Sequence, residues 1–330
     1  MARHPWVAAA DQQGVRFGPQ IGAIRRRPVL PRWELYDKPM EILLETGRLV
    51  ERLGFDAVYL HDHPLNSPEP WLGLAALAAV TERVMLGSVV NCVFYRHPAY
   101  LARMAADLDQ LSHGRLMLGL GVGWHHGEFA AYQQPFDSPG KRLAALEEAI
   151  AIIEGSWGPE RLSYQGKHFS TVEMAIVPGP LQQPRPPLMI AGAGEQVTLR
   201  QVARLADACN LDESKLPNGP ADIRRKLEVL QEHCEAVGRD YDEILRTHFV
   251  GWLMLAPSEA EVRRKVARYY PEGVPPQFGR FVHAGTPAQF VEFYQARVEA
   301  GIQYFVPQML DGTDHETLHL LAEEVMPEVG

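Results

Sequence analysis

Eight short apolar segments alternate with amphipathic segments along this chain of 330 residues, and this alternation limits the fold more than any other feature. The apolar segments predict strands at Val15–Ile21, Ala57–His61, Val84–Val90, Arg115–Gly119, Leu188–Ala191, Ala208–Leu211, Thr247–Leu255 and Tyr304–Gln308. Elsewhere, apolar residues recur at three- and four-residue spacing, which predicts helices. These helices are Met40–Leu53, Trp71–Thr81, Ala99–Leu111, Lys141–Gly155, Val197–Ala206, Ala221–Val237, Glu259–Tyr269 and Pro287–Ala300.

The strands are apolar on both faces, as strands of a parallel sheet covered by helices are. Eight strand–helix repeats favour an α/β fold of the (β/α)₈ barrel type, with an open doubly wound sheet as the alternative. No linker divides the chain, so residues 1–330 are predicted to form one domain. The irregular stretch at 156–187 is predicted to be an insertion between barrel units four and five.

The composition narrows the class of partner. A net charge of -9 argues against nucleic acid binding, which needs clustered basic residues. No run approaches the roughly 20 apolar residues that a membrane helix needs. Three cysteines, an odd number without a CxxC pair, suit a reducing compartment. We therefore expect a cytoplasmic protein that acts on a small molecule, with neither nucleic acid nor membrane as partner.

In a (β/α)₈ barrel, functional groups gather at the C-terminal ends of the strands and the loops that follow them, here called the rim. The second predicted strand ends in His61-Asp62-His63. In one reading, His63 is a general acid or base and Asp62 orients a ring or hydroxyl group. His61 and His63 also suit a metal-dependent barrel hydrolase. The third reading is an ordinary loop histidine.

Glycines and polar residues mark three further rim stretches. Asn91, after the third strand, offers both a donor and an acceptor to a heterocycle. The stretch Gly119–Phe129 fits neither the dinucleotide nor the Walker pattern, so we expect its glycines to make room for a flat ligand and Trp124 to seat the loop. His126 is expected to face water. The helix after Gly192–Val197 starts with free N–H groups, which favour an anion such as phosphate.

In order and spacing, several motifs together resemble the bacterial luciferase-like monooxygenase superfamily, especially its deazaflavin-dependent branch. The resemblance runs from about Val15 to the end of the chain. The residues that carry it are Gly54–Val58, Asp62-His63, Tyr95–Pro98, Leu108–Arg115, Gly119–Trp124, Gly192–Glu195, Thr198–Arg200, Ala206–Asn210 and Gly285–Pro287.

The resemblance implies a (β/α)₈ barrel that binds a flavin-like ring against the ends of strands two to four, with a non-proline cis peptide near Val89–Asn91 behind the ring. It implies catalytic roles for Asp62 and His63. His125 stands where relatives often carry an acid, and becomes a third catalytic candidate. The implied cofactor-binding residues are Asp62, Val89, Val90, Asn91, Gly121, Val122, Gly123, Gly192, Ala193, Gly194 and Thr198.

Two cofactors remain open. The deazaflavin coenzyme F420 would make the protein an oxidoreductase that transfers hydride to or from a small organic substrate. FMN would instead make it a two-component monooxygenase that uses dioxygen. The cluster Arg25–Arg27 fits the glutamate tail of coenzyme F420, or it is a solvated basic loop. The metal-dependent hydrolase and a non-catalytic cofactor carrier are the readings from other classes.

The predicted helices Trp71–Thr81 and Ala99–Leu111 are rich in Ala and Leu on more than one face. A helix that packs only on a barrel needs a single apolar face. We therefore predict a two-fold homodimer through these two helices.

Overall fold

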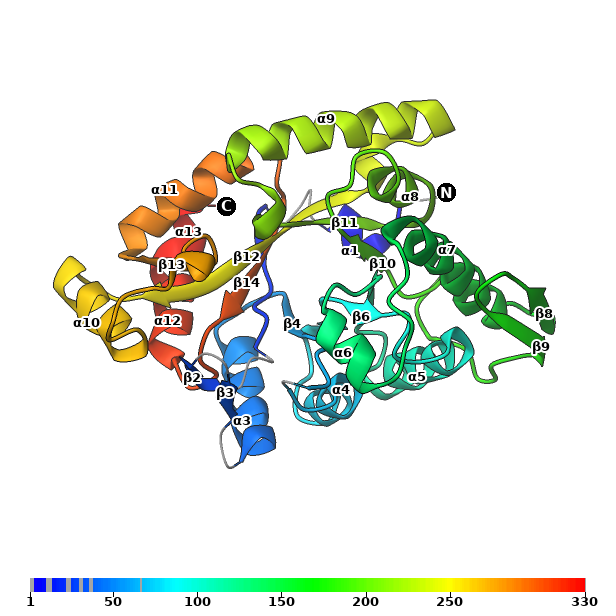
Figure 1. Cartoon of the computed structure of the whole chain (residues 1–330), viewed down its shortest axis with the longest axis horizontal. Coiled ribbons are helices and arrows are strands. Elements are labelled where there is room, and N and C mark those ends of the chain that lie inside the picture. The colour runs from blue at the N-terminus through cyan, green and yellow to red at the C-terminus, as the bar shows by residue number, and fades with distance from the viewer. Residues whose placement is uncertain are drawn as a thin grey trace.

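Parallel strands form a nearly closed ring with helices on its outside (Figure 1). The computed structural model describes residues 3–9, 14–21, 25–29, 32–35, 38–65 and 67–329, and for the strands at 25–29 and 32–35 only the backbone. The strand order is β1 (Arg16–Phe17), β14 (Tyr304–Met309), β12 (Leu245–Leu255), β11 (Ala208–Asp212), β10 (Leu188–Ala191), β7 (Leu116–Gly121), β5 (Met85–Ser88) and β4 (Ala57–Leu60). Gln20 joins both ends, since it bridges Tyr59 and Gln308.

The (β/α)₈ prediction is therefore confirmed, and each predicted helix is present within three residues of its expected ends. The covering helices are α3 (Pro39–Arg52), α4 (Pro70–Ala78), α5 (Pro98–Leu111), α7 (Pro139–Ser156), α8 (Thr198–Leu205), α9 (Pro220–Val237), α10 (Glu259–Tyr269) and α11 (Pro287–Val298). Most begin with proline, whose fixed φ suits a first helical turn. Among the described residues, no helix is both long and apolar enough to cross a bilayer.

Several elements supplement the eight repeats. The first predicted strand shortens to β1 and the bridge at Gln20. β6 (Asn91–Cys92) extends the sheet beside β7, and β13 (Val282–Gly285) extends it beside β12. The hairpin of β2 (Arg25–Val29) and β3 (Arg32–Leu35) follows β1 and was not predicted. A second hairpin, β8 (Leu162–Gln165) and β9 (Ser170–Met174), lies between α7 and β10.

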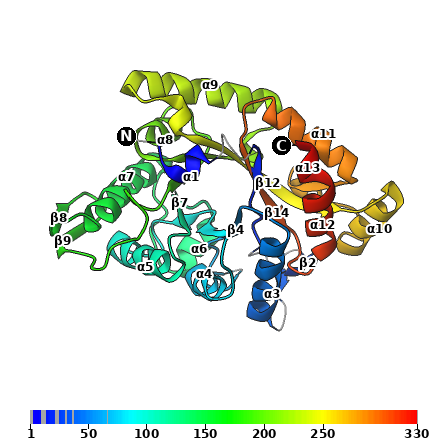
Figure 2. The same cartoon turned by 180° about the vertical axis from the view of Figure 1, so that it is seen from behind.

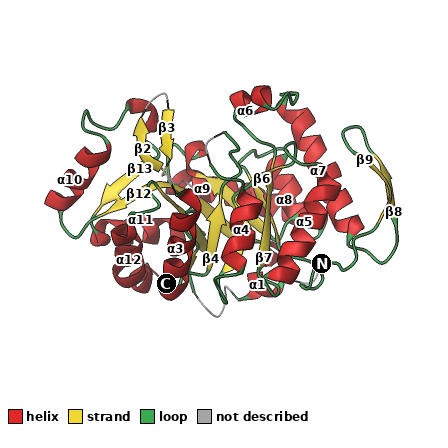
Figure 3. Ribbon diagram, turned by 90° about the horizontal axis from the view of Figure 1, so that it is seen from below, coloured by secondary structure: helices red, strands yellow, loops and turns green. Residues whose placement is uncertain are grey.

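The core has two layers. Inside the ring, side chains from successive strands fill the barrel, among them Tyr59, Met117, Met189 and Tyr304. The larger layer lies between strands and helices. The short helix α1 (Pro5–Ala8) adds Trp6 to the inner cluster, and Figure 2 shows α1 across one end of the ring. In Figure 3, α6 (His126–Ala131) stands at the opposite end, the rim.

Strand alternation fixes which side chains meet at the rim. Tyr59 belongs to the inner cluster and Leu60 to the outer one. Because neighbouring residues of a strand point to opposite faces, His61 continues the inner face and Asp62 the outer face. His61 and Asp62, although adjacent in the chain, therefore lie in different environments.

Candidate active site

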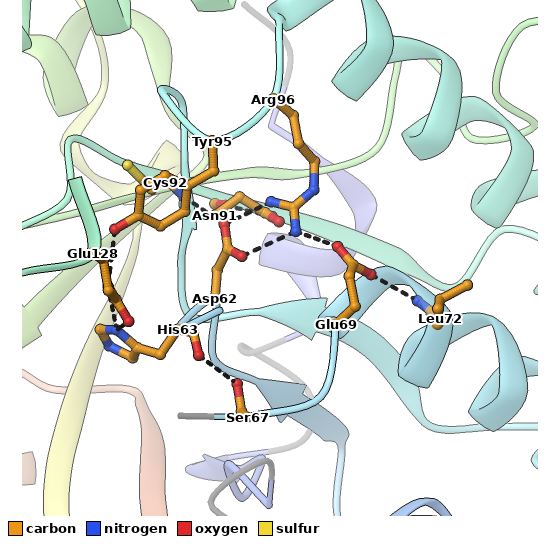
Figure 4. A network of polar contacts seen from close by, with 11 residues as sticks. Asp62, His63, Ser67, Glu69, Leu72, Asn91, Cys92, Tyr95, Arg96 and Glu128 are labelled. Atoms are coloured by element: carbon orange, nitrogen blue, oxygen red, sulfur yellow. Dashed lines mark hydrogen bonds and ion pairs between the residues drawn. The ribbon is translucent and has the colours of Figure 1, made fainter. Parts of the chain in front are cut away.

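A buried carboxylate orients the imidazole of His63. The Nδ1 atom of His63 lies 3.0 Å from both carboxylate oxygens of Glu128. Tyr95 donates its hydroxyl to Glu128 Oε2 at 2.9 Å, on the other side of the carboxylate (Figure 4). Glu128 is fully buried, whereas His63 keeps a quarter of its side chain exposed. The His63 imidazole is thus partly accessible at the rim, whereas the Glu128 carboxylate that orients it is buried.

The protonation states of this triad follow from its surroundings. Burial raises the pKa of Glu128, but the hydrogen bond and charge of His63 outweigh burial and bring the pKa below its ordinary value. Burial raises the pKa of Tyr95 far above its ordinary value. Glu128 is therefore an anion that accepts, and Tyr95 a neutral donor. This arrangement favours a proton on Nδ1 of His63 and leaves Nε2 for a ligand.

The role predicted for the Asp62 side chain needs correction. Its Oδ2 accepts from the backbone N–H of Cys92 at 3.0 Å and from Nη1 of Arg96 at 2.8 Å, while Oδ1 accepts from Nη2 at 3.1 Å. The side chain has no exposed surface. Burial raises the pKa of Asp62, and the ion pair with Arg96 opposes this rise. Asp62 therefore fixes β6 from behind, and its carboxylate is closed to direct proton exchange with a ligand.

Of the residues that follow β7, Trp124 differs from the expectation. Trp124 does not seat the loop, because 71% of its surface is exposed, and its ring lies 5.6 Å from that of His63. His125 accepts the backbone N–H of Glu128 through Nδ1 at 3.2 Å and so caps α6. The His125 ring is 6.5 Å from the His63 ring. His126 is exposed, as predicted.

The glycines of β7 make room for the protein's own chain. A Cβ atom on Gly119 would lie 2.1 Å from the carbonyl oxygen of Ser88, and one on Gly121 would lie 2.6 Å from Val90. The sequence predicts that these glycines clear space for a flat ligand, whereas Gly119 and Gly121 make room for backbone and side-chain atoms of the protein itself. They admit the bulge between β5 and β6, where the predicted non-proline cis peptide joins Val89 to Val90.

We expect Gly119→Ala to destabilise the fold by about 3 kcal/mol, because a backbone oxygen cannot move aside as a flexible side chain would. Urea denaturation measures the loss. Gly140→Ala is the matched control, since a Cβ at this helical position would meet nothing within 4 Å. Equal stability of the two variants would contradict the packing argument.

The turn Gly192–Val197 joins β10 to α8. The φ of Gly192 is 139°, and a Cβ on Gly194 would press on the Thr198 hydroxyl at 2.9 Å. Helix α8 has no side-chain cap, so its first N–H groups are not bound by a capping side chain. The Glu195 carboxylate anchors the turn to Lys226 of α9 at 2.7 Å. A rigid turn with such amides suits an anion.

The sheet register brings most predicted residues to one part of the rim. Strand β7 pairs with β5 and β6 on one side and with β10 on the other. Asn91 is opposite Leu120 in this register, and Ile190 is opposite Leu120 from the other side. The Gly121–Gly123 stretch therefore lies at the end of β7, with Val89–Asn91 on one side and Gly192–Thr198 on the other. The side chains of Arg25–Arg27 lie outside the described residues.

Sequence reasoning assigned no role to Glu128 or Gln20. Gln20 is fully buried and its amide Nε2 contacts Nδ1 of His61. Glu128 lies in the first turn of α6, and its carboxylate contacts His63 and Tyr95. The local sequence carries no pattern that indicates this pairing.

A metal-dependent hydrolase would need several side chains placed to bind a metal ion at the rim. His61 is engaged by Gln20 and His63 by Glu128. Among the residues that the structure describes, no group of three His, Cys, Asp or Glu side chains is placed to hold a metal ion. The rim therefore offers an oriented imidazole, buried side-chain amides and a glycine turn at the start of α8.

Comparison with known proteins gives the class of this barrel. Residues 26–310 match the model of the luciferase-like monooxygenase family, so the chain belongs to that family. The chain is 34% identical over 212 residues to an F420-dependent glucose-6-phosphate dehydrogenase of Microbacterium testaceum, covering 61% of each chain. The match thus spans about three-fifths of that relative's length.

Solved structures share the whole fold at low identity. An F420-dependent secondary alcohol dehydrogenase, in complex with an F420–acetone adduct, has a TM-score of 0.79 and 17% identity, covering 96% of this chain and 99% of the other. The monooxygenase RslO1 from Streptomyces bottropensis also has a TM-score of 0.79, with 22% identity, 96% of this chain and 100% of the other. At these identities the likeness concerns the fold alone.

Proposed function

We propose that this protein is an oxidoreductase that binds coenzyme F420 at the rim and transfers hydride between it and a small organic substrate. The relative from Microbacterium testaceum, named for an F420-dependent dehydrogenase, supports the choice of coenzyme. The observation that carries the proposal is the pair of His63 and Glu128, which presents a proton-exchanging nitrogen at the mouth of the barrel.

Two buried polar atoms fit a flavin-like ring. Asn91 donates Nδ2 to the Gly119 carbonyl at 3.0 Å, and its Oδ1 has no hydrogen-bond partner within the described part of the chain. The same holds for Oε1 of Gln20. A buried acceptor without a donor is costly, and ring N–H groups would supply donors. The Val89–Asn91 and Gly121–Gly123 stretches would hold the ring, and the Gly192–Thr198 turn its phosphate.

The protein's own task is proton transfer and orientation. When bound, the coenzyme supplies or accepts the hydride. Nε2 of His63 takes the hydroxyl proton when an alcohol is oxidised, or gives a proton to the oxygen when a carbonyl is reduced. Glu128 holds the ring at Nδ1 and stabilises the positive charge that this transfer creates. His125 caps the helix that carries Glu128 and so acts through position.

Anaerobic titration tests the choice of cofactor. We expect oxidised coenzyme F420 to bind, and a deazaflavin analogue without the phosphodiester to bind more weakly, because it leaves the Gly192–Thr198 turn empty. Bovine serum albumin is a control for nonspecific quenching. Tighter binding of FMN, with substrate-dependent uptake of dioxygen, would contradict the proposal in favour of the monooxygenase.

We further propose the homodimer through α4 and α5. Leu72 of α4 and Tyr100 of α5 are large apolar side chains that the single chain leaves exposed. Light scattering should give twice the 36.9 kDa of one chain. Leu72→Asp with Tyr100→Asp should give the monomer mass, since charges oppose burial in an interface. Val172→Asp, on the β8–β9 hairpin, is the control and should stay dimeric. A monomeric wild-type protein would disprove the interface.

A further inference from the structure

Three large apolar side chains remain exposed at the rim around His63. They are Leu65, Trp124 and Tyr132, with 49%, 71% and 50% of their surfaces exposed. They come from the loop after β4 and from the loop and helix after β7. The Tyr132 hydroxyl donates to the Pro64 carbonyl at 3.4 Å, which links the two loops. Exposed apolar groups that gather in one place mark a binding surface.

The indole of Trp124 lies beside the imidazole of His63. The two rings are 5.6 Å apart, and the ring of His125 lies 5.2 Å from that of Trp124. Glu128 occupies Nδ1 of His63. A molecule that meets the remaining nitrogen, Nε2, therefore has an aromatic face next to it. Such faces contribute large apolar contact area at low entropic cost.

The two loops that carry these side chains supply no lysine or arginine to bind a phosphate or carboxylate. Residues 53–82 and 116–140, which include both loops, contain no lysine or arginine. Two guanidinium groups that contact these loops are engaged. Arg96 pairs with Asp62 and Glu69, and Arg142 donates to the carbonyls of Val122, Gly123 and Asp137. The charge beside His63 is the anion Glu128, which repels a second anion.

We infer that the substrate is an uncharged alcohol or carbonyl compound with an aryl or bulky alkyl group that packs against Trp124; this inference rests on the proposed function. In the oxidation, the C–H bond next to the hydroxyl would break, and oxidised coenzyme F420, which the proposed function supplies, would accept its hydrogen as hydride. The hydroxyl proton passes to Nε2 of His63, and the C=O bond forms. Reduction of the carbonyl reverses each step.

Turnover of matched alcohols tests this substrate class. With oxidised coenzyme F420, 1-phenylethanol should have a higher kcat/KM than glucose 6-phosphate. Trp124→Ala should raise the KM for 1-phenylethanol roughly 10- to 100-fold, with a smaller change in kcat, as lost apolar contacts do. Val172→Ala, an exposed apolar residue on the distant hairpin, is the control and should match the wild type.

Binding without the coenzyme separates the two proposals. Saturation-transfer NMR should detect acetophenone on the wild-type protein and a weaker signal with Trp124→Ala. If the coenzyme does not bind while this signal persists, the proposed function fails and the apolar subsite stands. A preference for glucose 6-phosphate, or a KM and an NMR signal that Trp124→Ala leaves unchanged, would overturn the inference.

Discussion

His63→Ala should lower kcat by about 10²- to 10⁴-fold, the usual contribution of one positioned acid or base. The His63 side chain lies with its Nδ1 atom 3.0 Å from both carboxylate oxygens of Glu128. It keeps enough exposure to meet a substrate. Affinity for coenzyme F420 should change little, because the turn at Gly192–Thr198 and the amide of Asn91 are untouched. Stopped-flow absorbance of the coenzyme gives the rate.

Two controls make this result specific. His126→Ala removes an exposed imidazole two residues from Glu128 and should leave kcat unchanged. Added imidazole should restore part of the activity of His63→Ala, since the vacated space opens to the mouth. Full turnover by His63→Ala would show that His63 does not transfer the proton. A loss of folding, seen as a lower melting temperature than that of His126→Ala, would instead show a structural role.

Patterns spread along the chain predicted the barrel well, because each strand–helix unit carries its own signal. The β2–β3 hairpin was not predicted because β2 is rich in arginine and lacks the alternation of a strand, and β3 alternates over four residues only. The glycines of β7 show a second limit. Gly119 is required by the Ser88 carbonyl, 31 residues earlier in the chain, and only the folded sheet brings them together.

For the candidate site, too, the sequence indicated positions along the chain but not long-range contacts. Motifs at strand ends correctly located Asp62 and His63, since both follow β4 directly. Their roles depend on the alternation of faces, which sends Asp62 to Arg96 behind the sheet and leaves His63 at the mouth. The partner of His63 lies 65 residues away along the chain. Long-range pairs of this kind leave no periodic signal, so residue type alone could not reveal Glu128.

Glu128→Gln should lower kcat at least about tenfold with little change in KM, because the amide can donate to Nδ1 and so favour the wrong tautomer of His63. The wild-type carboxylate only accepts, which keeps the proton on Nδ1. Its pKa lies below the ordinary value of 4.5, so the anion is present at neutral pH. The stability it contributes is complete above about pH 4.5 and is lost as pH falls through the lower pKa of the folded state.

A purely structural role for Glu128 would alter stability without changing the tautomer, so ¹⁵N NMR of the histidine rings decides between the two. The His63 signals, assigned by their loss in His63→Ala, should report a protonated Nδ1 in the wild type and a protonated Nε2 in Glu128→Gln. Tyr95→Phe is the matched control: it removes one donor to the carboxylate but keeps its charge. It should preserve the wild-type tautomer and lose less activity. If Glu128→Gln keeps both the wild-type tautomer of His63 and the wild-type kcat, Glu128 does not contribute to proton transfer.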